Sequence, residues 1–268
     1  MTRCEIFRRL HHAPPTLLLP NCWDAASARI FEIAGFPAIA TSSAAIAYAL
    51  GYGDGQRLDV DAHFNAIANI VATVDVPVSV DLESGYANDP IGLAKNVRRL
   101  ALLGVAGYNL EDSAKPGVLY SIGEQCARIT AAKDAAPEVF LNARTDIFLE
   151  GIGDPSTALE RSIERLEAYL NAGADGIFVP GISDAETMAT IARRFPKRPL
   201  NVLAGPKTPT AAEMQGLGVA RISVGSWPMR RTLGVLRDIA RELRRDGTFN
   251  FTRDPVVSYD DANALFNR

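Results

Sequence analysis

Short apolar runs alternate with amphipathic helical stretches along most of the chain. The apolar runs have the length and punctuation of buried strands, and the stretches between them repeat apolar residues at three- and four-residue steps. The predicted strands span Thr16–Pro20, Pro37–Ser42, Pro77–Ser84, Ala106–Asp112, Val139–Thr145, Gly176–Gly181, Leu200–Gly205 and Arg221–Gly225. The clearest predicted helices span Met1–His12, Asp59–Val74, Asp89–Leu103, Asp154–Ala172 and Pro228–Arg245.

Glycines mark the joints between predicted helices and the strands that follow them. Gly35, Gly104, Gly173 and Gly218 each end a helix-like stretch, where glycine relieves the left-handed C-cap of an αβ turn. Eight such units in roughly 250 residues are the number and size of a (β/α)8 barrel. We therefore expect an α/β fold of the TIM-barrel type, a single domain over residues 1–268 with a C-terminal helical extension from about 228 to 268. A doubly wound open sheet is the alternative, but no G-x-G-x-x-G follows the first strand.

Composition and charge narrow the class of protein. The 268 residues are 47% hydrophobic and 22% charged, which suits a large globular core. The 28 basic and 31 acidic side chains give a net charge of -3 with no long block of one sign, so neither a nucleic acid nor a membrane is an expected partner. Three cysteines without a C-x-x-C pair indicate a reducing, cytoplasmic compartment. The uncharged stretch Ile33–Tyr52 contains Pro37 and is predicted as a buried strand and a small-residue helix instead of a membrane span.

Carboxylates gather at the predicted carboxyl ends of two strands, the face where a barrel of this type carries its chemistry. Asp81 and Glu83 share one parity on the third strand, and Glu111 on the next strand lies roughly 5 Å away. Converging carboxylates repel one another unless a cation lies among them, and a hard ion such as Mg²⁺, or Mn²⁺, suits an all-oxygen set. Alternatively, each carboxylate caps a helix or pairs with a basic side chain.

Arg144 ends the fifth predicted strand, beside the strand that carries Glu111. It either forms a salt bridge with that glutamate or presents its guanidinium to a substrate carboxylate or phosphoryl group. Ser42 and Ser43 end the second strand, where they either cap a helix or offer backbone N–H groups to a carbonyl oxygen.

Three further polar or aromatic residues have less specific expected roles. Trp23 follows the first strand and Asn201 lies within the seventh, and both are expected to line the substrate site. His63 falls in a helix-like stretch and is expected to be a surface or interface residue. Because no histidine lies near a strand end, no Ser–His or Cys–His couple is predicted.

Six fragments between about Leu17 and Arg230 together resemble the isocitrate lyase / phosphoenolpyruvate mutase superfamily. In order along the chain they are Pro20-Asn-Cys-Trp-Asp24, Thr41-Ser-Ser43 with Gly51-Tyr-Gly-Asp54, Val80-Asp-Leu-Glu-Ser-Gly-Tyr86, Gly107-Tyr-Asn-Leu-Glu-Asp112, Asn142-Ala-Arg144 and Ala172-Gly-Ala-Asp-Gly176. The resemblance implies a barrel that binds Mg²⁺ and a 2-oxo acid. It also implies a homo-oligomer, a dimer or tetramer, in which the last barrel helix, here Pro228–Arg245, is exchanged between subunits.

The resemblance also assigns roles to individual residues. Asp81 matches the principal metal carboxylate, and Glu83 and Glu111 match carboxylates that hold the ion directly or through water. The backbone N–H groups of Ser42 and Ser43 match the pair that receives the oxo oxygen. Asp54 matches an acid on a mobile gating segment, and Arg144 matches the arginine that faces the reacting end of the substrate.

Departures from the superfamily pattern favour one reaction over others. Isocitrate and methylisocitrate lyases carry a Lys-Lys-Cys-Gly-His loop after strand four, whereas Ser113–Tyr120 contains no cysteine. In the mutases and phosphonopyruvate hydrolases a lysine stands in place of Ser113 and a histidine in place of Pro180. Decarboxylation of a 3-carboxy-2-oxo acid releases neutral CO₂ and needs no such acid. The predicted function is therefore a Mg²⁺-dependent carbon–carbon lyase or decarboxylase acting on oxaloacetate or a 3-alkyl homologue.

Three alternatives remain open at this point. The first is an enzyme like the phosphonomutases or phosphonopyruvate hydrolases, and the second is one like the methylisocitrate lyases. The third is of another class, a catalytically silent barrel that binds a small carboxylic acid.

Overall fold

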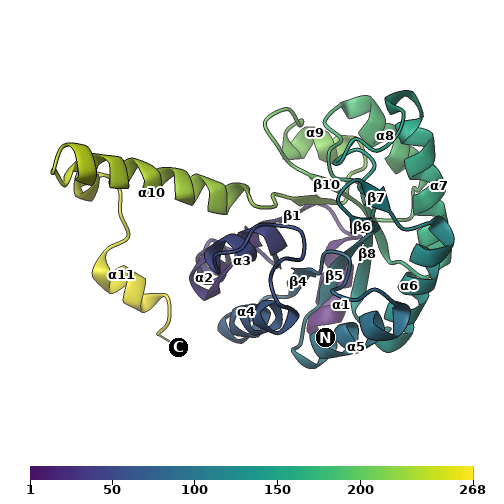
Figure 1. The fold of residues 1–268 in the computed structure, drawn as a ribbon, viewed down its shortest axis with the longest axis horizontal. Coiled ribbons are helices and arrows are strands. Elements are labelled where there is room, and N and C mark those ends of the chain that lie inside the picture. Colours follow the sequence, from purple (N-terminus) through teal and green to yellow (C-terminus); the bar gives the residue numbers. More distant parts are fainter. Residues whose placement is uncertain (268) are drawn as a thin grey trace.

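The computed structural model describes residues 1–267 as a parallel β-sheet surrounded by helices (Figure 1). The sheet order is β1-β11-β10-β9-β8-β5-β4-β3-β2. Its strands are β1 (Leu17–Leu19), β2 (Asn21–Cys22), β3 (Ile39–Thr41), β4 (Val78–Asp81), β5 (Gly107–Glu111), β8 (Phe140–Arg144), β9 (Gly176–Phe178), β10 (Leu200–Leu203) and β11 (Arg221–Ser223). The helices are α1 (Arg3–Leu10), α2 (Ala25–Ile33), α3 (Ser43–Ala49), α4 (Val60–Thr73), α5 (Pro90–Leu102), α6 (Ile122–Ala135), α7 (Ala158–Asn171), α8 (Ala185–Arg194), α9 (Ala211–Gly216), α10 (Trp227–Arg245) and α11 (Tyr259–Ala264), with 3-10 turns η1 (Pro155–Thr157) and η2 (Asn250–Arg253).

The two ends of the sheet belong to one broken strand, which closes the barrel. β1 pairs with β11, while β2 pairs with β3 on the other side. Pro20 separates them because it has no N–H to donate, although its carbonyl oxygen still accepts a hydrogen bond from the Ala40 N–H at 2.8 Å. The expected (β/α)8 barrel is confirmed.

The eight predicted strands are present in the predicted order, each somewhat shorter than expected. The four joint glycines all have positive φ, between 80° and 110°, which explains why glycine follows those helices. The stretch Ile33–Tyr52 forms β3 and α3, as predicted. A short antiparallel hairpin of β6 (Ser113–Lys115) and β7 (Val118–Leu119) was not predicted. No helix among residues 1–267 combines the length and apolarity that crossing a membrane requires.

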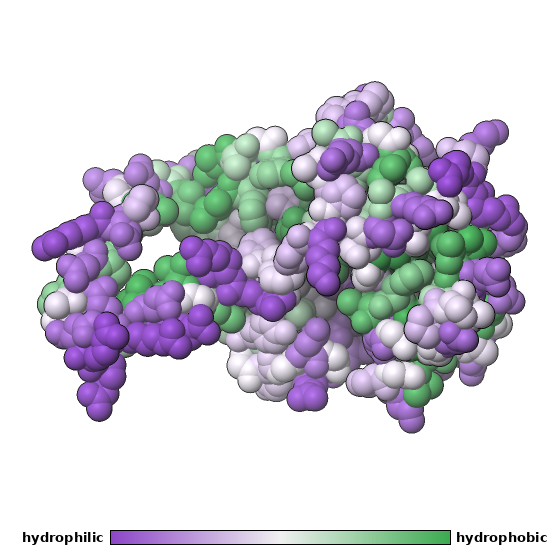
Figure 2. All heavy atoms as spheres, turned by 90° about the horizontal axis from the view of Figure 1, so that it is seen from above, coloured by the Kyte–Doolittle hydropathy of each residue, from purple (hydrophilic) through white to green (hydrophobic). Residues whose placement is uncertain are grey.

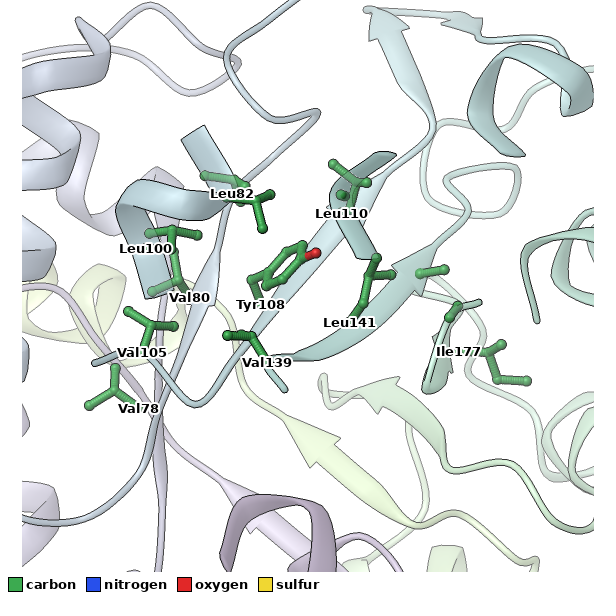
Figure 3. Packing of buried hydrophobic residues seen from close by; sticks show 14 of the residues in the cluster. Val78, Val80, Leu82, Leu100, Val105, Tyr108, Leu110, Val139, Leu141 and Ile177 are labelled. Atoms are coloured by element: carbon green, nitrogen blue, oxygen red, sulfur yellow. The ribbon is translucent and has the colours of Figure 1, made fainter. Parts of the chain in front are cut away.

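Alternation along the strands separates an apolar outer layer from a polar interior. The outward side chains of neighbouring strands pack under the helices, as Figure 3 shows for Val78, Val80, Tyr108, Leu110 and Leu141. The residues between them, including Ser79, Asn109 and Asn142, face the barrel interior and are buried. The period-two pattern thus places the strand-end polar groups on the interior side.

Helix α1 closes the amino end of the barrel. Phe7 is fully buried there and packs edge-on against Phe140, with ring centroids 5.7 Å apart. Gly107 is required beneath it, because a Cβ atom at that position would lie 2.6 Å from the Phe7 ring. Phe7 therefore fills the barrel interior at its amino end, and the cavity lined by the strand-end polar residues opens at the opposite end.

The expectation for His63 was wrong. Its side chain is fully buried in α4 and stacks on the ring of Tyr86 at 5.0 Å between centroids. Burial lowers the pKa of His63 to about 4, so the ring is neutral near pH 7. The helical pattern identified the helix but not the loop after β4, which covers this residue.

Helix α10 leaves the barrel as a projecting arm (Figure 1). Of its 19 residues only Met229 is buried. Its apolar side chains are exposed, among them Leu233, Leu236 and Leu243. Figure 2 shows apolar residues along this projecting side of the molecule, where α10 and the C-terminal segment lie.

Candidate active site

A cavity of about 420 Å³ opens at the carboxyl ends of the barrel strands. Its walls come from loops after most of the strands and from the first turn of α10. Among its lining residues are seven that the sequence singled out: Ser42, Ser43, Asp54, Asp81, Glu83, Glu111 and Arg144. The structure therefore brings together residues that are up to 102 positions apart.

Arg144 is the centre of the charge arrangement. β5 and β8 pair in register, so Glu111 lies opposite Arg144, and Nη1 of Arg144 is 3.0 Å from Glu111 Oε2. The same Nη1 lies 3.9 Å from Asp81 Oδ1, and Nε donates to Asp146 Oδ1 at 2.6 Å. The predicted pair with Glu111 is thus present, as one arm of a larger ion cluster.

The pKa values of Arg144 and Glu111 are both raised above their ordinary values, for different reasons. Burial alone would lower the pKa of Arg144, but the carboxylates of Asp146, Glu111 and Asp81 raise it well above its ordinary value. Burial raises the pKa of Glu111, the charge of Arg144 opposes that rise, and Asp146 adds to it. The cavity therefore holds a permanent cation among carboxyl groups whose charge depends on their neighbours.

Asp146 is a positioning residue that sequence analysis did not assign to the site. Its Oδ2 accepts a hydrogen bond from the Ser113 hydroxyl at 2.8 Å, and its backbone N–H donates to Asp112 Oδ1 at 3.1 Å. Asp112 is itself held by the Tyr169 hydroxyl at 2.7 Å. Asp146 has the strand parity of Arg144, a signal that could have identified it.

Glu83 lines the cavity but turns its carboxylate toward a neighbouring loop. Its φ of 51° departs from the strand conformation that sequence parity assumed. Oε1 accepts from the Tyr86 hydroxyl at 2.5 Å, and Oε2 accepts from the Gln56 N–H at 2.7 Å. Burial raises the pKa of Glu83 to about 7, opposed by the Tyr86 bond and reinforced by Asp81 and Asp54. Asp54 also lines the cavity, and partial desolvation raises its pKa.

Ser42 and Ser43 have different local roles. The Ser42 hydroxyl accepts from the Ala45 N–H at 3.3 Å and caps α3, which was one of its two predicted roles. Its own N–H donates to the Cys22 carbonyl oxygen at 3.0 Å and so serves the sheet, which corrects its prediction as a donor to a ligand. Ser43 remains beside the carboxylates, with its hydroxyl 2.7 Å and its N–H 3.3 Å from Asp81 Oδ2.

Two predicted substrate residues, Trp23 and Asn201, are not among the residues that line this cavity. Trp23 packs against the hydrophobic core. Asn201 lies in a buried layer, where its Oδ1 accepts from the Ser223 hydroxyl at 3.2 Å. Strand parity predicts that Asn201 points into the barrel, but it does not predict how far below the cavity the side chain lies.

Trp227 and Arg230, from the first turn of α10, line the mouth of the cavity instead. The Arg230 guanidinium stacks 4.2 Å from the centroid of the Trp227 ring. Among residues 1–267 the contact of the Arg230 guanidinium is with this ring and with no carboxylate, so its charge is available to a ligand in the cavity. Both residues follow shortly after β11 in the sequence, and this position could have identified them as site residues.

The residues fit a divalent cation by their donor chemistry, although the structure contains no preformed three-ligand set. Within the described part of the chain, no three His, Cys, Asp or Glu side chains are grouped closely enough to hold an ion. Arg144 lies between Asp81 and Glu111, while Glu83 turns away. Asp81 Oδ1, however, is buried without a hydrogen-bond partner. Because Mg²⁺ retains several waters and needs only one or two carboxylates, Asp81 with its neighbours suits it.

A second cavity of about 460 Å³ adjoins the first at Gly55, Glu83, Glu111 and Glu150. The β6–β7 hairpin forms one of its walls and contributes Lys115. Glu150 holds the hairpin in place, accepting from the Gly117 N–H at 2.6 Å and from the Ser113 hydroxyl at 3.0 Å. Directly after β5, where the sequence lacks the cysteine loop of the lyases, the chain therefore carries a short hairpin that Glu150 holds in place.

Comparison with known proteins gives similar chains of nearly full length. The sequence profile of the family described as phosphoenolpyruvate phosphomutase matches residues 7–244. An uncharacterised protein of Mycobacterium tuberculosis H37Rv is 38% identical over 238 residues, 88% of each chain. The 2-methylisocitrate lyase of Bacillus subtilis is 30% identical over 281 residues, 97% of this chain and 90% of the relative. A solved structure from Burkholderia cenocepacia J2315, provisionally assigned as a lyase/mutase, has a TM-score of 0.91 at 39% identity and covers 99% of this chain and 96% of its own.

Proposed function

Because the chain belongs to the phosphoenolpyruvate phosphomutase family, as its motifs suggested, we propose that it is a cytoplasmic, magnesium-dependent carbon–carbon lyase that decarboxylates a small 3-carboxy-2-oxo acid. The proposed substrate is oxaloacetate or a 3-alkyl homologue. The observation that carries this proposal is the permanent cation of Arg144 at a carboxylate-lined cavity, next to a hairpin without a cysteine. Three free thiols fit a reducing compartment.

Two arginines suit the two anionic ends of such a substrate. Arg144 uses Nε and Nη1 within the ion cluster, which fixes the plane of its guanidinium and leaves Nη2 for a ligand. Arg230, stacked on Trp227 at the mouth, is placed to bind a second carboxylate. A dicarboxylic acid is therefore preferred over a monocarboxylic acid of the same length.

Asp81, with Glu83 and Glu111 nearby, would hold the metal ion. When bound, Mg²⁺ would supply Lewis-acid polarisation of the 2-oxo group. The charge of Arg144 would stabilise the negative charge that develops on the 2-oxo oxygen as the bond to the departing carboxyl carbon breaks. The N–H of Ser43, which donates to Asp81 in this structure, would turn to that oxygen as a second donor. The bonding electron pair moves toward that oxygen, and CO₂ leaves. Asp54, which lines the cavity, would deliver a proton to C3, and pyruvate results.

The direct test measures CO₂ and pyruvate from oxaloacetate with and without Mg²⁺. We expect Mg²⁺-dependent release of both products, faster than the metal-catalysed background. Methylisocitrate and phosphonopyruvate are assayed in parallel. Turnover of either one without turnover of oxaloacetate would contradict the proposed reaction and favour one of the other superfamily chemistries. If no acid is turned over, although Mg²⁺ and oxalate together raise Tm, the protein is an acid-binding barrel.

We also propose that α10 packs on a second copy of the chain and makes the protein a homo-oligomer. A monomer would leave a 19-residue amphipathic helix almost uncovered. One face carries Leu233, Leu236, Ala240 and Leu243, and another carries Arg237, Arg241 and Arg244. An apolar stripe along a helix of roughly 28 Å is typical of a helix–helix interface.

Leu236→Glu is expected to weaken this assembly, because it would bury a charge in the proposed interface. Light scattering after size-exclusion chromatography should show an oligomer for the wild type and mainly monomer for the variant. Arg237→Glu, an adjacent substitution on the polar face, is the control and should leave the oligomer intact. A monomeric wild type at micromolar concentration would contradict the proposal.

A further inference from the structure

The segment of residues 51–55, which carries Asp54 and is called the Asp54 segment, is attached loosely to the rest of the molecule. It contains Gly51, Gly53 and Gly55, and the first and last of these have φ values of 85° and 88°. Residues 53–55 form no hydrogen bond to another element of the described chain, since the Gly55 N–H donates only to Asp54 Oδ1. Left-handed glycines with open space around them allow such a segment to change conformation easily.

Gln56 is the point at which this segment is fixed. Its backbone N–H donates to Glu83 Oε2 at 2.7 Å. Its side-chain amide bridges the turn after β4, where Nε2 donates to the Ser84 hydroxyl and Oε1 accepts from the Tyr86 N–H at 3.0 Å. One residue thus satisfies three partners on the loop that also presents Glu83 to the cavity.

The backbone conformation supports a specific role for this contact. Gln56, Glu83 and Tyr86 have φ values of 54°, 51° and 52°, in the left-handed region that residues other than glycine seldom adopt. Conformations of this kind persist where surrounding contacts determine them, and they cluster at functional sites. Here hydrogen bonds join all three left-handed residues, because Gln56 contacts both Glu83 and Tyr86.

We propose that Gln56 is a positioning residue that holds the Asp54 segment over the cavity by gripping the turn after β4. The role of Asp54 in turnover rests on the proposed function, whereas the mechanical role of Gln56 does not. Because the same turn supplies Glu83, the position of the segment and the arrangement of the carboxylates are linked. Loss of the Gln56 amide is expected to release the segment and withdraw Asp54 from the cavity without unfolding the barrel.

Amide hydrogen exchange of the full-length protein tests this inference without any substrate. Gln56→Met keeps the side-chain length and the backbone N–H but removes both polar groups. We expect two amides to exchange about tenfold faster or more, that of residue 56, which donates to Glu83, and that of Tyr86, which donates to Gln56 Oε1 in the wild type. Amides of β4 and β5 should be unchanged. Lys95→Met, a change to the same residue type at an exposed position outside this segment, should leave exchange unaltered. Unchanged exchange of the amide of residue 56 in the Gln56→Met variant would overturn the proposal.

A second variant and an activity measurement complete the test. Gln56→Gly adopts the left-handed conformation without strain but lacks the amide, so it should loosen the segment as Gln56→Met does. Wild-type exchange in Gln56→Gly would show that the backbone conformation alone holds the segment, against the proposal. With oxaloacetate as substrate, kcat should fall about tenfold in Gln56→Met at unchanged Tm. A loosened segment with wild-type kcat would also contradict the positioning role, whereas an inactive wild type with a Gln56-dependent segment would count only against the proposed function.

Discussion

Replacing Arg144 with lysine is expected to lower kcat/KM for oxaloacetate by about 30- to 150-fold, the equivalent of one lost charge-assisted hydrogen bond of about 2 to 3 kcal/mol. Lysine keeps the positive charge among Asp81, Glu111 and Asp146, so none of these carboxylates is left without a countercharge. An ammonium group cannot, however, keep both the fixed plane set by Asp146 and a second donor for the substrate. Steady-state kinetics with a thermal melt of each variant separates the effect on activity from any effect on folding.

The control for this substitution is Arg194→Lys, which alters an exposed ion pair with Glu167. Exposed pairs contribute about 0 to 1 kcal/mol, so both Tm and turnover should stay near wild type. If Arg144→Lys instead lowers Tm strongly while the folded fraction keeps full specific activity, Arg144 serves as a structural ion pair and its catalytic role is wrong.

Asp81→Asn is expected to abolish the stabilisation of the protein by Mg²⁺. A ligand at 100 times its Kd stabilises the folded state by about 2.7 kcal/mol, which corresponds to a rise in Tm of roughly 5 to 10 °C for a chain of this size. The variant should lose this rise and also lose Mg²⁺-dependent turnover, because Oδ1 of Asp81 is buried and accepts no hydrogen bond, which leaves it for a metal ion. Differential scanning fluorimetry over a Mg²⁺ titration measures the effect.

Smaller losses are expected for Glu83→Gln and Glu111→Gln, whose carboxylates are engaged by Tyr86 and Gln56 and by Arg144. Asp134→Asn, at an exposed carboxylate on α6, should show the wild-type response to Mg²⁺. An unaltered Mg²⁺ response in all three cavity variants would show that these residues share no metal site.

Most of the fold could be predicted because its signals are local. Strand alternation and the glycines after helices depend on neighbours a few residues away, so the order of the strands and the face of each strand were predictable. Closure of the barrel also followed, since repeated parallel β/α units of one handedness have few other arrangements. Strand parity then placed Asp81, Glu111 and Arg144 at one end of the barrel, and the structure agrees.

The remaining features depend on contacts between distant segments. The structure alone decided that Glu83 leaves the strand conformation and faces Gln56, and that the Ser42 N–H is used by the sheet. It also decided that His63 is covered by Tyr86, and that Trp227 and Arg230, in place of Trp23 and Asn201, reach the cavity. Each outcome depends on which loop fills the space above a residue. Residue identity and local periodicity fix the direction of a side chain, whereas its depth and its partner are set only when the closed barrel brings separate loops together.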